Sequence, residues 1–346
     1  MPDRLTGMIR IAAEEAWAPA DILGRYKKLL EEKPQAWDPG FHSLWGFFLG
    51  AKPRATALVR RIQDLEDERL RDMDATGIAK QLVFLTAPGV QVFDAASAVS
   101  MARDYNDELA AAIRKHPDRY AGLASIAPQD PQAAVKELQR GVEQLKLKGI
   151  VVNSHTQGEY LDEPKYWPIF EAAQALDVPI YIHPQTPPAS MIGPFLPRGL
   201  DGAIYGFAVE TGLHLLRIIV GGVFDRFPGL KIAVGHLGEG LPFWLFRLDY
   251  MHRSMVVSER YPGAKPLARK PSDYLKQNVW ITTSGMQWAP AIRFCQEVLG
   301  ADRVLYAMDY PYQFVPEEVK VTDEMKISEA ERKLLYQTNA ERLFKL

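Results

Sequence analysis

Short runs of β-branched and other apolar residues alternate along the chain with longer segments of helical periodicity, and this alternation limits the possible folds most strongly. Such a pattern is typical of repeated βα units and a parallel sheet. Eight such units are the number that closes a parallel barrel. We therefore predict an α/β fold, a distorted (β/α)8 barrel of the TIM type. The expected strands are Met8–Ala13, Gln81–Thr86, Tyr120–Ile126, Gly149–Asn153, Val178–His183, Leu230–Gly235, Val279–Ser284 and Val304–Asp309.

The length of 346 residues fits one barrel with insertions, and we expect a single domain over residues 1–346. Two connections are too long for plain turns: an insertion at about 18–72 after the first strand, and a loop at about 185–210 after the fifth. Loops at the carboxyl end of barrel strands carry function, so both are expected to lie over the active site. Their aromatic and apolar residues are expected to wall a pocket: Trp37, Trp45, Phe47, Phe48, Met191, Phe195 and Tyr205.

Composition excludes several classes of protein. Lys plus Arg is 41 and Asp plus Glu is 43, so the formal net charge of -2 gives no field that would attract nucleic acid. No segment has the roughly twenty apolar residues that cross a bilayer. The single Cys295 excludes an intrachain disulfide. We expect a soluble cytoplasmic protein that has no nucleic-acid or membrane partner.

Residues that can bind a metal stand at the predicted ends of four strands, namely Glu14, His183, His236 and Asp309. A lone histidine at a strand end is more often structural than functional, but parallel strands bring their last side chains to one rim, and the coincidence favours a site. These donors suit a divalent ion and tolerate zinc, manganese or iron. The neighbouring acids Glu14 and Glu15 should point to opposite faces of their strand, and the sequence does not decide which enters the barrel mouth.

Three further residues have both a functional and a structural interpretation. Glu239 lies close enough along the chain to orient the imidazole of His236, or else it caps the helix that follows. Arg54 and Arg247 stand in largely apolar surroundings, where each could clamp a substrate carboxylate. The alternative is an ordinary ion pair, for example between Arg247 and Asp249.

The motifs around these residues resemble a known family. They are Ala13-Glu14-Glu15-Ala16, Thr86-Ala87-Pro88-Gly89-Val90-Gln91, Tyr181-Ile182-His183-Pro184, Gly221-Gly222-Val223-Phe224-Asp225, Gly235-His236-Leu237-Gly238-Glu239 and Met308-Asp309-Tyr310-Pro311. From about Ile9 to Leu346 the chain is similar to the amidohydrolase-related decarboxylases, which include aminocarboxymuconate semialdehyde, γ-resorcylate and 2,3-dihydroxybenzoate decarboxylases. Several members open with a His-x-His pair. The Glu14-Glu15-Ala16 segment instead resembles the branch that decarboxylates hydroxylated benzoates.

This resemblance implies one divalent ion, Mn²⁺ with Zn²⁺ as the alternative, held by Glu14, His183 and Asp309, and no organic cofactor. It also implies that Arg54 and Arg247 meet substrate carboxylates. The catalytic residues would be Asp309, which carries a proton to the ring, with His236 and Glu239 supporting proton movement.

The resemblance further implies non-oxidative decarboxylation of a small aromatic carboxylate, 5-carboxyvanillate to vanillate and CO₂, within lignin and aromatic-compound catabolism. The alternatives are another hydroxybenzoate, either 2,3-dihydroxybenzoate or γ-resorcylate, and a metal-dependent hydrolase on the same barrel. A barrel that serves only as a binding module would lack tightly bound metal. Apolar residues in the first insertion and near Trp244–Met255 indicate a homo-oligomer, a dimer or a tetramer.

Overall fold

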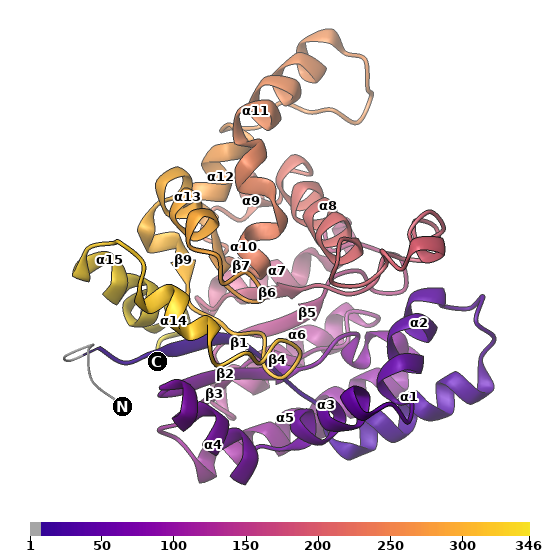
Figure 1. Ribbon diagram of the computed structural model, residues 1–346. Coiled ribbons are helices and arrows are strands. Elements are labelled where there is room, and N and C mark those ends of the chain that lie inside the picture. Colours follow the sequence, from indigo (N-terminus) through magenta and orange to yellow (C-terminus); the bar gives the residue numbers. More distant parts are fainter. Residues whose placement is uncertain (1–7) are drawn as a thin grey trace.

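In the computed structural model, which describes residues 8–346, parallel strands form a barrel that helices surround (Figure 1). The strands pair in the orders β1-β2-β3 and β4-β5-β6-β7-β8-β9, and every pair is parallel. Their bounds are β1 Ile11–Trp17, β2 Lys80–Leu85, β3 Tyr120–Gly122, β4 Ala124–Ser125, β5 Ile150–Asn153, β6 Ile180–His183, β7 Ile232–Val234, β8 Val279–Thr282 and β9 Val304–Leu305.

The two sheets join into one barrel at both of their edges. Only Leu123 separates β3 from β4. On the other side, the N–H of Ala13 donates to the carbonyl of Tyr306 (2.9 Å), and the N–H of Ala16 donates to that of Tyr310 (2.7 Å). The first strand therefore lies beside the last, as the barrel prediction requires, and the predicted fold class is confirmed.

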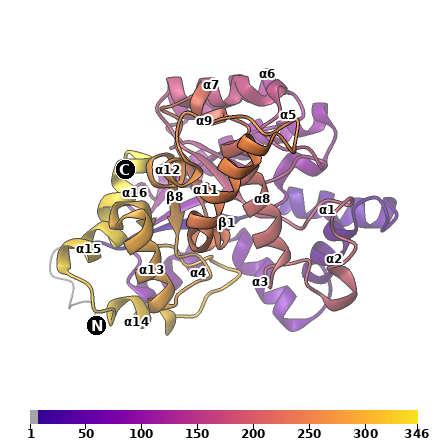
Figure 2. The same cartoon turned by 90° about the horizontal axis from the view of Figure 1, so that it is seen from above.

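Helices cover the outside of the barrel, and Figure 2 shows α1 to α3 on one side of β1 with α13 to α15 on the other. Asp94 and Asp130 start two of these helices by accepting hydrogen bonds from backbone N–H groups in the first turn. The helices are α1 Ala20–Glu32, α2 Pro39–Phe48, α3 Pro53–Gln63, α4 Asp67–Thr76, α5 Ala95–Lys115, α6 Pro131–Glu143, α7 Trp167–Ala175, α8 Gly206–Val220, α9 Val223–Arg226, α10 His236–Glu239, α11 Leu241–Ser258, α12 Pro271–Asn278, α13 Ala289–Leu299, α14 Glu318–Asp323, α15 Glu329–Lys333 and α16 Asn339–Phe344.

Alternate strand residues fill the barrel. Ala13, Phe84, Tyr181 and others form a buried cluster inside the barrel, the inner cluster. A larger cluster lies between the strands and the helices. Phe344 of α16 belongs to the inner cluster, so the last helix packs against the barrel interior. Side chains on alternating positions thus face two different cores, which is the burial pattern of parallel strands covered on both faces.

Three predicted strands have wrong boundaries. The strand expected over Val304–Asp309 ends at Leu305, so Asp309 lies four positions beyond β9 rather than at its end. The single strand expected over Tyr120–Ile126 is interrupted at Leu123. The first strand continues through Glu14 to Trp17, so Glu14 lies in the middle of β1 rather than at its end. The pairing of β1 with β2 shifts register between Ala12 and Glu15, and this local irregularity lets a mid-strand carboxylate face the rim.

The two long connections after β1 and β6 contain secondary structure of their own. The insertion after β1 folds into α1, α2, α3 and α4. The loop after β6 has a short helical turn at Leu196–Arg198 and ends where α8 begins at Gly206. Trp45, which was predicted to wall a pocket, is instead fully buried and donates from its indole N–H to the carbonyl of Ala87.

Candidate active site

Three of the predicted metal ligands lie together at the rim of the barrel. Glu14, His183 and Asp309 each offer a ligand atom, and these atoms are all within 4.8 Å of one another. The Nε2 atom of His183 is 3.8 Å from Oε1 of Glu14, and Nε2 of His236 is 3.8 Å from the same oxygen. Four residues separated by almost the whole chain therefore converge on one point, as the predicted strand order requires.

The carboxylate of Glu14 is anchored on one oxygen only. Its Oε2 accepts hydrogen bonds from the hydroxyl groups of Tyr181 and, at 2.6 Å, of Thr282. Its Oε1, which faces the two imidazoles, is buried and has no hydrogen-bond partner among the described residues. A buried polar atom without a partner is costly, and a divalent cation at this point would satisfy it. The residues therefore fit a metal ion.

The protonation of His183 also suits a ligand. Burial lowers the pKa of His183 to about 4, against the opposing charge of Glu14, so the imidazole is neutral at pH 7. Neutral imidazole is the form that binds a metal. Burial raises the pKa of Asp309 to about 8; the charge of His236 opposes this rise, and the nearby Glu14 and Glu239 add to it.

His236 and Glu239 form a hydrogen-bonded pair, with Nδ1 of the imidazole 2.8 Å from Oε1 of the carboxylate. Burial alone would lower the pKa of His236, but the charges of Glu239 and Glu14 outweigh it and raise the pKa to about 10. The alternative in which Glu239 caps the next helix does not hold, because Gly240 is the N-cap of α11. His236 and Glu239 both have positive φ (50° and 55°), so a tight turn brings the pair together.

The structure also settles which of the adjacent acids enters the site. Glu14 does, whereas Glu15 points away and is fully buried. Its carboxylate accepts hydrogen bonds from the backbone N–H groups of Met308 (2.9 Å) and Tyr310 (3.0 Å). Burial raises the pKa of Glu15 to about 8, although these two N–H groups and the charge of Arg69 act in the opposite direction.

The two predicted substrate-binding arginines are both exposed, Arg54 in the first turn of α3 and Arg247 in α11. Neither makes an ion pair with any residue between 8 and 346. The suggested pair of Arg247 with Asp249 is not formed, since Asp249 instead accepts from the backbone N–H (2.9 Å) and hydroxyl (2.7 Å) of Ser272. Binding of substrate by these arginines therefore stays a prediction.

Sequence reasoning missed the residues that anchor the ligands, Tyr181, Thr282 and Glu15. Two of them left a signal in the sequence. Tyr181 precedes His183 by two positions on β6 and therefore shares its face of the sheet, while Thr282 is the last residue of β8. Both are polar residues on otherwise apolar strands, which indicates a role at the rim.

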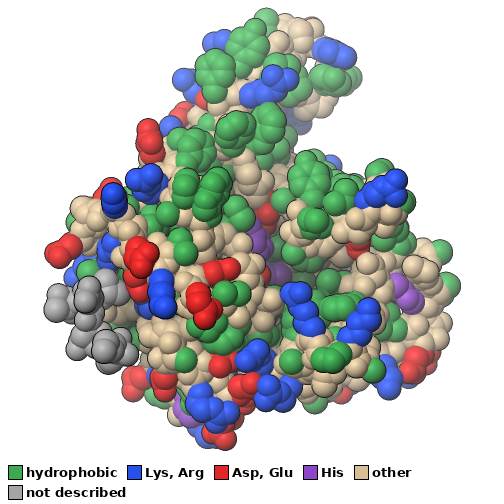
Figure 3. Space-filling view, viewed as in Figure 1, with side chains coloured by type: hydrophobic (Ala, Val, Ile, Leu, Met, Phe, Trp, Pro, Cys, Tyr) green, Lys and Arg blue, Asp and Glu red, His purple; other side chains and the backbone are tan. Residues whose placement is uncertain are grey.

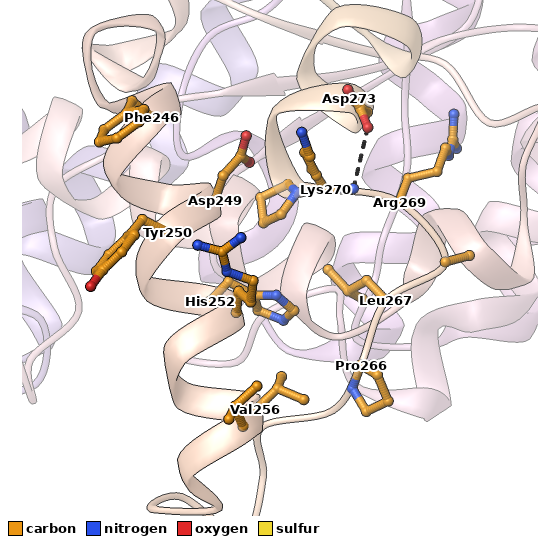
Figure 4. A pocket seen from close by; sticks show the side chains of 14 residues that line it. Phe246, Asp249, Tyr250, His252, Val256, Pro266, Leu267, Arg269, Lys270 and Asp273 are labelled. Atoms are coloured by element: carbon orange, nitrogen blue, oxygen red, sulfur yellow. Dashed lines mark hydrogen bonds between the residues drawn. The ribbon is translucent and has the colours of Figure 1, made fainter.

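Two cavities lie outside the cluster, since neither is lined by Glu14, His183, His236 or Asp309. One, of about 690 Å³, is lined by Trp37 and Asp38 of the first insertion and by His155, Gln185 and residues 188–190 of the loops after β5 and β6. The other, of about 650 Å³, lies between α11 and residues 266–273 (Figure 4). Figure 3 shows a hollow near the middle of the face, with histidine side chains inside it.

Comparison with known proteins identifies the class. The model of the amidohydrolase family matches residues 36–346, and the chain belongs to that family. The resemblance predicted from the motifs is thereby confirmed.

Individual solved structures and curated proteins show which members of the family the chain resembles. The chain is 52% identical to the 5-carboxyvanillate decarboxylase of Novosphingobium aromaticivorans, over 98% of this chain and 97% of that chain with a TM-score of 0.96; that structure holds manganese and 4-hydroxy-3-methoxy-5-nitrobenzoic acid. It is 38% identical to the 5-carboxyvanillate decarboxylase of Sphingomonas paucimobilis, over 98% and 100% of the two chains, with a TM-score of 0.92. It is also 38% identical to the γ-resorcylate decarboxylase of a Polaromonas species, covering 83% of this chain and 89% of that protein.

Within residues 8–346, none of the helices combines the length and the apolar character that crossing a membrane demands.

Proposed function

We propose that this protein is a manganese-dependent, non-oxidative decarboxylase that converts 5-carboxyvanillate to vanillate and CO₂. The convergence of Glu14, His183 and Asp309 around a buried, unpartnered carboxylate oxygen carries the proposal. The relative that is 52% identical holds manganese together with a nitro compound of the same ring pattern, 4-hydroxy-3-methoxy-5-nitrobenzoic acid. That likeness supports both the metal and the substrate class.

Glu14, His183 and Asp309 would hold the ion, and His236 stands beside it. When bound, a divalent ion orients the phenolate and its neighbouring carboxylate and offsets charge as the ring is protonated. The exposed Arg54 and Arg247 bind the carboxylate that stays on the ring and fix the register of the substrate.

Loss of CO₂ requires a proton at the ring carbon that bears the departing carboxylate. Asp309 delivers that proton, the carbon–carbon bond then breaks, and its electron pair restores the aromatic ring. His236, hydrogen-bonded to Glu239, returns a proton to Asp309 for the next turnover. The net reaction consumes one proton and releases CO₂, so no oxidant or organic cofactor takes part.

The test is release of CO₂ from 5-carboxyvanillate, γ-resorcylate and 2,3-dihydroxybenzoate by protein of measured manganese content. We expect the highest kcat/KM with 5-carboxyvanillate. Asp309→Asn should abolish turnover, whereas the matched change Asp302→Asn, at an exposed acid that pairs with Arg303, should leave it intact. Full activity of a manganese-loaded Asp309→Asn protein would contradict the proton-transfer role.

The same assay discriminates the alternatives. The γ-resorcylate decarboxylases are 38% and 39% identical over 83% and 84% of this chain, so a preference for γ-resorcylate is the second candidate. A hydrolase would release no CO₂ from any of the three acids but would hydrolyse an ester or amide. Either result would replace the proposed reaction.

A homo-oligomer, a dimer or a tetramer, is also part of this proposal. Helix α11 projects from the barrel with exposed apolar side chains, including Phe246 (84% exposed), Val257 (78%) and Phe243 (75%) (Figure 1). Exposed apolar residues on one projecting element are typical of an interface. The cavity between α11 and residues 266–273 would accept a segment of the second copy. Light scattering should give a multiple of the 39.0 kDa chain mass, and Phe246→Glu should reduce it.

We further propose a cytoplasmic role in the catabolism of lignin-derived aromatic acids. The expected substrate carries the hydroxyl and methoxy groups of a lignin fragment. A strain that lacks the gene should lose growth on 5-carboxyvanillate and keep growth on vanillate. Unchanged growth on both would contradict this role.

A further inference from the structure

The carboxylate of Glu15 holds the backbone on both sides of Asp309. It accepts hydrogen bonds from the N–H of Met308 (2.9 Å) and from the N–H of Tyr310 (3.0 Å), the residues immediately before and after Asp309. Glu15 is fully buried, with 0% of its surface exposed, so both bonds are shielded from water. A carboxyl group whose two oxygens each accept from a backbone N–H fixes the direction of both N–H groups.

Asp309 needs such a contact because its own backbone conformation is unusual. Its φ is 71°, in the left-handed region that residues other than glycine adopt rarely, although aspartate tolerates it better than most. The segment that holds Asp309 follows the two-residue strand β9, so the strand ladder ends before it. Contacts from neighbouring elements must therefore define where the Asp309 carboxylate points.

The first strand supplies these contacts together with a ligand. Glu15 forms a bridge with Tyr310, and the N–H of the next residue, Ala16, donates to the carbonyl of Tyr310 (2.7 Å). Arg69, also fully buried, donates to the carbonyl of Ala16 (2.6 Å) and stacks over the ring of Tyr310 at 4.6 Å. Glu14 on one face of β1 and Asp309 on the neighbouring segment are thus tied through a single rigid stretch of backbone.

We propose that Glu15 is a positioning residue that sets the placement of Asp309 relative to Glu14, and so prepares the cluster to bind a divalent cation. The inference rests on the proposed metal site. It assigns to the second glutamate of the pair a role separate from that of the first: Glu14 offers an oxygen to the ion, while Glu15 orients another ligand through its backbone. Partners that orient metal ligands typically change metal affinity or activity by about 10- to 100-fold when they are lost.

The test is the dissociation constant for Mn²⁺, measured from the electron paramagnetic resonance signal of free Mn²⁺. Glu15→Gln places an amide NH₂ against one of the two backbone N–H groups, so that group loses its acceptor. We expect Mn²⁺ binding to weaken about 10- to 100-fold. Glu15→Asp, whose carboxylate is one methylene shorter, should weaken binding in the same direction and serves if the glutamine variant does not fold.

A matched control separates this role from general destabilisation. Asn278 is also buried and donates two side-chain hydrogen bonds, to the carbonyls of Pro228 (3.0 Å) and Leu230 (2.9 Å), but these precede β7 and lie at the opposite end of the barrel from the cluster. Asn278→Ala should lower the melting temperature and change the Mn²⁺ dissociation constant by less than about twofold.

A double-mutant cycle with Asp309→Ala shows whether Glu15 acts through Asp309. In that background no carboxylate is left to orient, so Glu15→Gln should change Mn²⁺ affinity by less than about twofold. The inference is overturned if Glu15→Gln and Glu15→Asp bind Mn²⁺ like the wild type, or if Glu15→Gln weakens binding equally in both backgrounds. If Asp309→Ala alone binds Mn²⁺ like the wild type, the proposed ligand set fails, and the role of Glu15 fails with it.

Discussion

Gly235→Ala tests the geometry of the site with a single added methyl group. A Cβ atom at Gly235 would lie 2.6 Å from both carboxylate oxygens of Glu14. Gly235 itself has φ -72° and ψ -176°, which alanine adopts freely, so the substitution introduces no backbone strain of its own. Any effect must therefore come from the contact with Glu14.

The size of the effect follows from the distances. Ordinary contacts of a Cβ atom begin near 3.4 Å, so the carboxylate or the backbone must give way by about 0.8 Å. Metal–ligand distances vary by only about 0.2 Å, so a displacement of this size removes Glu14 as a well-placed ligand. Glu14 cannot turn aside without cost, because Tyr181 and Thr282 hold its other oxygen. We expect Mn²⁺ affinity to fall at least about 10-fold, and overpacking to cost about 1–3 kcal/mol of stability.

The assay is Mn²⁺ titration beside thermal unfolding of the metal-free protein, with Gly24→Ala as the control. Gly24 lies in α1 with nothing within 4 Å of an added Cβ, so alanine there should stabilise the helix slightly and leave Mn²⁺ binding unchanged. Wild-type Mn²⁺ affinity in Gly235→Ala would refute the reasoning, because it would mean that Glu14 does not hold the ion from its present position.

Three further results are expected. Burial lowers the pKa of His214 to about 3. Because the unfolded state binds a proton near pH 6.5 and the folded state does not, the free energy of unfolding should fall as the pH drops from 6.5 toward 3, and urea unfolding should show a loss of about 2 kcal/mol from this group between pH 7 and pH 5. If His214→Gln keeps the wild-type dependence of unfolding free energy on pH, this assignment is wrong. Arg54→Ala should raise KM for 5-carboxyvanillate more than it lowers kcat. The control Arg60→Ala, at an arginine that pairs with Glu68, should leave KM unchanged. Equal KM values for the two variants would show that Arg54 does not bind the substrate. Chelation should lower the melting temperature, since an ion at about 100 times its dissociation constant adds about 2.7 kcal/mol; unchanged melting after dialysis against a chelator would argue against the site.

Local patterns predicted most of the secondary structure. Helix α5 over Ala95–Lys115 follows from the local sequence, because an amphipathic run comes after a good capping residue, Asp94. The predicted strand boundaries were wrong where contacts with distant residues set them. The first strand continues past Glu14 because Ala16 and Trp17 pair with Phe84 and Leu85 of β2. These partners lie 68 positions further along the chain, so no local sequence pattern indicates them.

The sequence by itself determined the fold class and the grouping of His183, His236 and Asp309 at one rim. It could do so because alternating βα units bring the carboxyl ends of all barrel strands to the same rim. Only the tertiary structure decided that Glu14, and not Glu15, faces the other ligands. Alternation along a strand sends the two side chains to opposite faces, but which face is inward depends on the register of β1 against β2 and on the contact of Glu15 with the segment around Asp309. That register is a property of two strands together, and therefore it cannot be read from either one alone.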